Sequence, residues 1–95
     1  LFMSVIIVTG SSGLVGSAVV KKFHDEGYEV VGIDNDLRAE FFGVEASTRS
    51  EAERQIKTFE RFHQLDVDIR DDASLAKVFG KYKTSISAVV HALLT

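Results

Sequence analysis

The chain lacks cysteine, a surplus of basic residues and any long apolar run. Without cysteine it can form neither disulfides nor thiolate metal sites, and it has no cysteine nucleophile. Its 11 basic residues are scattered among 14 acidic ones, whereas nucleic-acid binders concentrate lysine and arginine. The apolar opening from Leu1 to Val8 is too short to span a bilayer or to act as a signal peptide. We therefore expect no nucleic acid or membrane as partner, and a cytoplasmic location.

The composition is that of one small globular domain. The 95 residues leave little room for a second domain. Hydrophobic residues make up 45% of the chain and charged residues 26%, as in ordinary soluble proteins. A domain of this size buries only about 60 to 65% of the surface that its unfolded chain exposes. We therefore predict an ordered domain with a small margin of stability.

Short β-branched runs alternate with longer stretches of helical spacing, which is the pattern of an α/β sheet. Strands are predicted at residues 5–9, 29–34, 61–66 and 86–91, and helices at residues 14–26 and 48–57 and from Asp71 or Asp72 onward. Right-handed crossovers would give the strand order 3-2-1-4. This order is one side of a Rossmann-type, doubly wound parallel sheet, and a full domain of that type needs further strands. Residues 1–95 are thus predicted to be a C-terminally incomplete domain of this type.

The spacing of apolar residues also predicts which helix faces are buried. In the first helix the apolar positions are Val15, Ala18, Val19 and Phe23. Gly27 follows the helix at the position where a C-terminal cap in the left-handed conformation is expected. In the last helix the apolar positions are Leu75, Val78, Phe79 and Tyr82. Residues 35–47 show no period and are predicted to be a loop that packs its own aromatic residues. His24 and His63 are predicted to be surface or half-buried residues, and no spacing of His, Asp and Glu indicates a metal site.

A glycine-rich turn between the first strand and the first helix is the strongest functional signal. Gly10, Gly13 and Gly16 would let the chain turn tightly, bring backbone amides to a pyrophosphate and pack the helix close to the strand. The phosphates would lie at the helix N-terminus, where unpaired N–H groups and the dipole favour negative charge. No Gly-Lys-Ser/Thr closes the motif, which excludes a mononucleotide P-loop. The alternative is a purely structural strand-to-helix turn.

The acid at the end of the second strand predicts which dinucleotide binds. Asp34 follows Gly16 at about the 20-residue separation at which this fold places an acid against the adenosine ribose. A carboxylate there accepts hydrogen bonds from the ribose hydroxyls and repels a 2′-phosphate, so NAD is preferred to NADP. Arg38 opposes this prediction, because a nearby arginine can accommodate a 2′-phosphate. The alternative to a ribose-binding role is that Asp34 only begins a turn after the second strand.

The spacing Gly10-x-x-Gly13-x-x-Gly16 after Thr9 resembles that of the extended short-chain dehydrogenase/reductases. In that family an Asp followed by Ile, Val or Leu after the third strand contacts the adenine, and the pair Asp68 and Ile69 is similar. The resemblance implies that Asp68 accepts a hydrogen bond from the adenine amino group. The alternative is that Asp68 only belongs to a polar turn before the next helix.

A narrower resemblance covers residues 31–38, Phe41-Phe42-Gly43 and Ala46-Ser47-Thr48. These stretches are similar to NAD-dependent epimerases/dehydratases related to the CDP-paratose (CDP-tyvelose) 2-epimerases. The sequence departs from the family pattern after His91-Ala92, where Leu93 and Leu94 replace small residues and could crowd the nicotinamide ribose. His91 itself is predicted to be a structural residue at a strand end rather than an acid or base.

The resemblance implies that the catalytic residues lie outside residues 1–95. The family uses a Tyr-x-x-x-Lys pair, but Tyr28 is followed four positions later by Gly32, and Tyr82 by Ile86. The chain is therefore expected to supply the NAD site of a nucleotide-sugar epimerase or dehydratase that oxidises and re-reduces a sugar hydroxyl. A non-catalytic dinucleotide-binding module or sensor, or a fragment that binds nothing, remains open. The residues assigned to the cofactor are Gly10, Ser12, Gly13, Leu14, Val15, Gly16, Asp34, Asn35, Arg38, Asp68, Ile69 and His91.

Overall fold

The computed structural model describes residues 4–34 and 49–92, which form four strands and three helices. In chain order they are β1 (Val5–Thr9), α1 (Leu14–Asp25), β2 (Glu29–Ile33), α3 (Arg49–Thr58), β3 (Phe62–Leu65), α4 (Asp72–Tyr82) and β4 (Ile86–His91). Every element predicted in these ranges is present, and the ends differ from the predicted ones by one residue at most, which is the usual uncertainty at element ends. The predicted loop at residues 35–47, and Thr48 in the predicted helix cap, lie outside the described residues.

The four strands form one parallel sheet in the order β3-β2-β1-β4. This order confirms the predicted fold class. In the register, Val8 lies beside Gly32 of β2 on one side and Val90 of β4 on the other. Because all four strands run the same way, their carboxyl ends meet at one edge of the sheet, where open α/β sheets bind their ligands.

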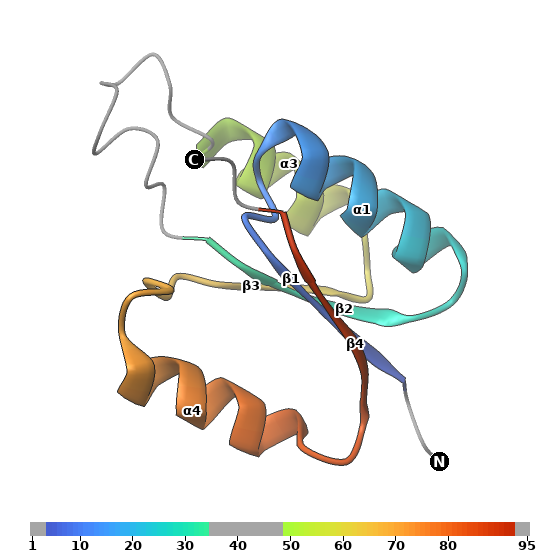
Figure 1. Ribbon diagram of the computed structural model, residues 1–95. Coiled ribbons are helices and arrows are strands. Elements are labelled where there is room, and N and C mark those ends of the chain that lie inside the picture. Colours follow the sequence, from blue (N-terminus) through green and yellow to red (C-terminus); the bar gives the residue numbers. More distant parts are fainter. Residues whose placement is uncertain (1–3, 35–48, 93–95) are drawn as a thin grey trace.

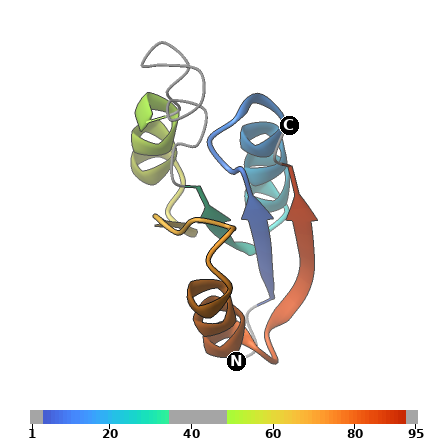
Figure 2. The same ribbon diagram turned by 60° about the vertical axis from the view of Figure 1, so that its left-hand side comes forward.

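Helices cover both faces of the sheet, as Figure 1 shows with α1 and α3 above it and α4 below. The same three layers are seen from a second direction in Figure 2. Successive side chains of β1 point to opposite faces. Ile6 and Val8 therefore belong to the core cluster under α1 and α3, whereas Val5 and Ile7 belong to the cluster that α4 covers. All five residues of β1 are buried, as the continuous apolar run predicted.

Helix α4 confirms the face that its apolar spacing predicted. Val78 is buried, and Leu75, Phe79 and Tyr82 pack against the same core cluster. Of the two predicted caps, the structure uses Asp71, whose carboxylate accepts hydrogen bonds from the backbone N–H and the hydroxyl of Ser74. These hydrogen bonds stabilise the charged form and lower the pKa of Asp71 below its usual value. This cap fixes where the segment after β3 ends and α4 begins.

Helix α1 has the predicted period, and the predicted face is confirmed in part, since Val19 and Phe23 pack against the core cluster under this helix. Val15 and Ala18 are exposed, and the buried positions are Gly16, Val20 and His24. These three recur every four residues and therefore share one face. The face is set by Gly16, which must lie against the turn before the helix, rather than by the largest apolar residues. The predicted left-handed cap is confirmed, since Gly27 has φ +97°.

His24 is buried, which corrects the prediction of a surface or half-buried residue. Its ring packs against Phe59, with 4.8 Å between the ring centroids. Its Nε2 accepts a hydrogen bond from the backbone N–H of Arg61 at 3.3 Å, and its carbonyl oxygen accepts one from the Arg61 guanidinium at 2.7 Å. His24 thus ties the end of α1 to the turn before β3. His63 is exposed, as predicted.

In the ranges 4–34 and 49–92, no helix is long and apolar enough to cross a membrane. The cytoplasmic location expected from the sequence stays a prediction.

Candidate functional site

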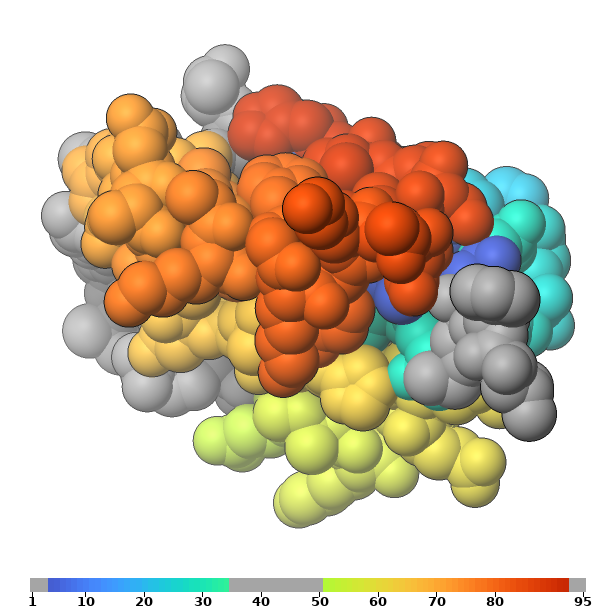
Figure 3. All heavy atoms as spheres, turned by 90° about the horizontal axis from the view of Figure 1, so that it is seen from below, coloured from blue at the N-terminus to red at the C-terminus, as the bar shows by residue number. Residues whose placement is uncertain are grey.

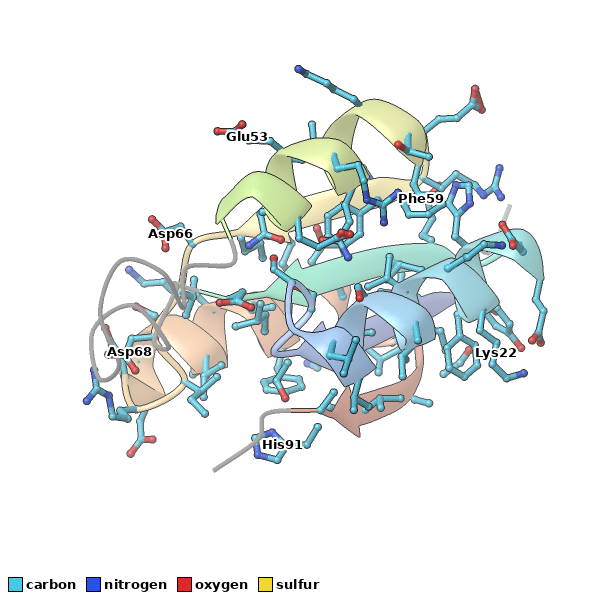
Figure 4. All side chains as sticks on the ribbon, turned by 90° about the horizontal axis from the view of Figure 1, so that it is seen from above. Lys22, Glu53, Phe59, Asp66, Asp68 and His91 are labelled. Atoms are coloured by element: carbon cyan, nitrogen blue, oxygen red, sulfur yellow. The ribbon has the colours of Figure 1, made fainter. Side chains whose placement is uncertain are left out.

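Those predicted site residues that the structure describes gather at the carboxyl edge of the sheet. The glycine-rich turn follows β1, Asp34 follows β2, Asp68 and Ile69 follow β3, and His91 ends β4. Figure 4 shows Asp68 in the segment before α4 and His91 at the end of β4. Strands β2 and β1 lie between β3 and β4. Residues from four separate parts of the sequence therefore meet along one edge.

The glycine-rich turn is held tightly between β1 and α1. Gly10 has φ +68°, a left-handed conformation that favours glycine, and its N–H donates to the carbonyl oxygen of Ile33 at 2.8 Å. The N–H of Gly13 donates back to the carbonyl oxygen of Gly10 at 3.1 Å. A Cβ atom on Gly16 would lie 1.9 Å from that same oxygen. The turn thus needs glycine at Gly10 for its conformation and at Gly16 for helix packing.

Gly13 has a different role from its two neighbours in the motif. Its backbone is extended, with φ −77° and ψ 176°, a conformation that residues with side chains adopt without strain. A Cβ on Gly13 would only touch the Gly10 oxygen, at 3.4 Å. Within the described residues, the folded chain therefore has room for a side chain at Gly13. A ligand that approaches the backbone of Gly13 closely would, in contrast, require glycine at this position.

The N-terminus of α1 is open to an anion. Its N-cap residue, Gly13, provides no side-chain hydrogen bond to the first turn, and that turn contains no acidic residue. The first N–H groups of a helix have no intrahelical partner, and the helix dipole adds partial positive charge at this end. Leu14 is 84% exposed and Val15 46% exposed, so apolar side chains border the open helix end. This is the geometry in which helices bind phosphate groups.

Asp34 lies against the glycine-rich turn. Its Oδ2 accepts a hydrogen bond from the backbone N–H of Ser12 at 3.1 Å, and the Asp34 side chain is half-buried. The hydroxyl of Ser12 is buried and has no hydrogen-bond partner among the described residues. A buried polar group without a partner costs free energy, about 1–3 kcal/mol. A ligand oxygen at the turn would give this hydroxyl a partner.

Two glutamines that the sequence reasoning missed support this turn from α3 and β3. Gln55 is fully buried, and its Nε2 donates to the carbonyl oxygen of Ser11 at 2.8 Å. Gln64 contacts both the Ser11 hydroxyl and the Asp34 carbonyl oxygen. The sequence offered one signal for Gln55, because it precedes the apolar residue Phe59 by four positions, a spacing that places two residues on the same side of a helix. Gln64 carried no such signal.

Asp68 is paired with Arg70, a residue that the sequence reasoning did not consider. The carboxylate of Asp68 accepts from the backbone N–H of Arg70 at 2.8 Å and from its guanidinium at 2.6 to 3.0 Å. Ile69 packs against the core cluster that α4 covers. The segment between β3 and α4 is therefore held in a defined position at the edge, and any adenine bound there would meet an Asp68 carboxylate already oriented by Arg70.

His91 lies beside the start of the glycine-rich turn. Its Nδ1 and the Thr9 hydroxyl are 2.5 Å apart, and the N–H of Ala92 donates to the Thr9 carbonyl oxygen at 3.0 Å. These contacts join the ends of β1 and β4, the two strands between which a doubly wound sheet reverses its strand order. They also fit the prediction of a structural role at a strand end. Asn35 and Arg38 lie outside the described residues.

The features at this edge fit a dinucleotide. The glycine-rich turn and the open helix end suit a pyrophosphate, and the carboxylate of Asp34 beside them suits a ribose. A parallel sheet in the order β3-β2-β1-β4 with this turn defines the class of Rossmann-type dinucleotide-binding proteins. Residues 6–94 match the NAD dependent epimerase/dehydratase family. The chain belongs to this family.

Relatives of known function are similar over most of the chain. The UDP-glucose 4-epimerase of Schizosaccharomyces pombe is 38% identical over 86 residues, which are 90% of this chain and 22% of that protein. The UDP-glucose 4-epimerase of Mus musculus is 34% identical over 89 residues, which are 94% of this chain and 25% of that protein. The chain therefore spans about a quarter of the length of these relatives. They do not confirm the narrower resemblance to CDP-paratose 2-epimerases.

Solved structures agree with this assignment. The enzyme WbmH of Bordetella bronchiseptica, solved in complex with NAD+, superimposes with a TM-score of 0.72 at 26% identity and covers 98% of this chain and 27% of its own. The UDP-Glc/GlcNAc 4-epimerase of Campylobacter jejuni has a TM-score of 0.75 at 22% identity, covering 97% of this chain and 25% of its own. The latter similarity shows the fold alone.

Proposed function

We propose that the carboxyl edge of this sheet binds NAD in a nucleotide-sugar epimerase or dehydratase. The observation that carries the proposal is the hydrogen bond between the Ser12 N–H and Asp34 Oδ2. It places a carboxylate suited to ribose hydroxyls directly beside a turn suited to a pyrophosphate. The family assignment and the NAD complex of a similar structure support the same cofactor. We further propose that residues 1–95 are one part of a larger Rossmann-type domain.

The roles proposed for individual residues follow from their positions. The turn and the first residues of α1 would face the pyrophosphate, Asp34 the adenosine ribose, and Asp68 with Ile69 the adenine. Asn35 and Arg38 would border the ribose, and His91 would lie on the nicotinamide side, where β4 ends. The residues proposed to face the pyrophosphate are Gly10, Ser12, Gly13, Leu14, Val15 and Gly16.

The reaction proposed for the complete protein is the oxidation and re-reduction of a sugar hydroxyl on a nucleotide sugar, or a related dehydration. NAD would accept and return the hydride, and this chain would hold NAD in place. Several relatives are named as UDP-glucose 4-epimerases, which supports a nucleotide sugar as substrate class. The test is turnover of UDP-glucose by the complete protein. Failure with UDP-glucose and CDP-activated sugars alike would contradict the proposed substrate class.

We expect NAD to bind at least about tenfold more tightly than NADP, a difference of about 1.4 kcal/mol. Asp34 can accept hydrogen bonds from both ribose hydroxyls, whereas a 2′-phosphate would place like charges together. Titration calorimetry with both cofactors measures the ratio, and Asp34→Asn should reduce it. The control Glu53→Gln removes one negative charge from an exposed position on α3 and should leave the ratio unchanged. Equal affinities of the unaltered protein for the two cofactors would remove the ribose role from Asp34.

A polypeptide of residues 1–95 is expected to self-associate through β4. In the described sheet β4 pairs only with β1, so its other side offers unpaired N–H and C=O groups, and Val89 is 46% exposed there. Figure 3 shows β4 in red beside α4 in orange on this face. Light scattering should report a mass above that of the monomer.

A charge on the edge strand should weaken this association, because charged side chains discourage strand pairing. Val89→Lys should therefore shift the mass toward the monomer. Ile56→Lys is the matched control, since Ile56 is 54% exposed on α3, away from this edge. A monomeric polypeptide, or an equal effect of both substitutions, would contradict association through β4.

A further inference from the structure

Ser11, the first residue after the left-handed glycine of the turn, is held from three directions. It is fully buried, although it lies in a turn at the edge of the sheet. Its carbonyl oxygen accepts from Gln55 of α3, its hydroxyl donates to Gln64 of β3, and its side chain lies over Gly32 of β2. Each of these contacts comes from a different element. The turn is therefore positioned by parts of the chain that do not belong to the glycine motif.

Gln55 makes the best-defined of these contacts. A carbonyl oxygen can only accept, so the atom that faces Ser11 at 2.8 Å must be the amide nitrogen. The other atom of this amide, Oε1, is buried and has no hydrogen-bond partner among the described residues. An apolar side chain of the same size would avoid this unpaired acceptor. The amide of Gln55 is thus poorly explained by the stability of the core and well explained by its contact with the turn.

Gln64 connects the turn to the acid that follows β2. Its Nε2 donates to the carbonyl oxygen of Asp34 at 3.2 Å, which fixes the orientation of the amide. Its Oε1 then accepts from the Ser11 hydroxyl at 3.3 Å. One side chain of β3 therefore contacts both the turn that faces the pyrophosphate and the residue that faces the ribose.

Gly32 makes this arrangement possible. A Cβ atom on Gly32 would lie 2.4 Å from the Ser11 hydroxyl oxygen and 2.7 Å from the ring of Phe62. The side chain of Ser11 thus occupies the space that a side chain at position 32 would fill if Gly32 were replaced. This explains why Ser11 can lie flat on the sheet and reach Gln64, which pairs with Gly32 in the strand register.

We propose that Gln55 and Gln64 are positioning residues of the dinucleotide site, which hold the glycine-rich turn, through Ser11, in the conformation that binds a pyrophosphate. This inference rests on the proposed NAD site. The binding groups of the turn are backbone amides, whose directions are set only by the conformation of the turn. Fixing that conformation before the ligand arrives removes part of the entropy cost of binding. Gln55 would act through the Ser11 carbonyl oxygen, and Gln64 through the Ser11 hydroxyl and the Asp34 carbonyl oxygen.

The test compares NAD binding with folding stability in the complete protein. Gln55→Met keeps the size of the side chain and removes the donor to Ser11, and Gln64→Met removes the connection to Asp34. We expect each substitution to raise the dissociation constant of NAD about 5- to 10-fold, as measured by calorimetry at a temperature where the protein is folded. The urea midpoint of Gln55→Met should change little. The substitution removes the unpaired acceptor Oε1 of Gln55 and leaves the carbonyl oxygen of Ser11 as an unpaired acceptor in its place.

The matched control is Val78→Ala, which opens a cavity under α4 on the opposite face of the sheet. It should lower the urea midpoint and leave the dissociation constant of NAD unchanged, as a purely structural change would. If Gln55→Met does not fold, Gln64→Met and Ser11→Ala provide the same comparison. Unchanged NAD affinity in the folded variants would overturn the positioning role alone. Absence of NAD binding by the unaltered protein would overturn the proposed function and this inference together.

Discussion

Replacing Gly16 by alanine is expected to lower the free energy of unfolding by about 3 kcal/mol, at the upper end of the usual cost of overpacking. The added Cβ atom would lie 1.9 Å from the carbonyl oxygen of Gly10 and 2.9 Å from the Cα of Ser11. Both are backbone atoms of a turn that hydrogen bonds hold to β2, so they cannot move aside as the end of a flexible side chain can. Urea denaturation followed by circular dichroism measures the change.

Gly80 provides the matched control for this substitution. It lies on the exposed side of α4, and a Cβ atom there would meet nothing within 4 Å. Gly80→Ala should raise the free energy of unfolding by about 0.5–1 kcal/mol, because alanine loses less conformational freedom than glycine in a helix. Equal urea midpoints for Gly16→Ala and the unaltered chain would contradict the close packing of α1 on the turn.

Replacing Gly13 by valine is expected to weaken NAD binding by more than about 100-fold, or about 2.7 kcal/mol, while the protein remains folded. The extended backbone of Gly13 accepts a β-branched residue, and a Cβ there only touches Gly10. In the proposed complex, however, the branched side chain would occupy the space of the pyrophosphate at the start of α1. Calorimetry with NAD and a denaturation curve of the same sample separate the two effects.

Ala18→Val is the control for a branched side chain on α1. Ala18 is exposed and lies beyond the glycine-rich turn, so this variant should bind NAD as the unaltered protein does. A folded Gly13→Val variant that binds NAD with full affinity would refute the phosphate-binding role of the turn. Gly16→Ala and Gly13→Val together distinguish a glycine that is required for packing, Gly16, from one that is required for ligand binding, Gly13.

The order of elements and the strand topology were predictable because both depend on local patterns. The continuous apolar run of β1 indicates a strand buried on both faces, and the spacing in α4 indicates a helix with one apolar stripe. Right-handed crossovers between such units leave few possible sheet orders. The position of Asp34 beside the turn followed as well, since both come after neighbouring parallel strands. The sequence by itself therefore determined the fold class, the strand order and the edge where the site lies.

Only the tertiary structure decided the rotation of α1 and the support of the turn. The apolar residues of α1 predicted a face containing Val15 and Ala18, but the approach of Gly16 to the Gly10 oxygen turns Val20 and His24 inward instead. The contacts of Gln55 with Ser11 and of Gln64 with Asp34 join residues that are 44 and 30 positions apart. A periodicity reports which residues share a face and not what that face meets. Contacts at such separations exist only after the sheet has brought the elements together.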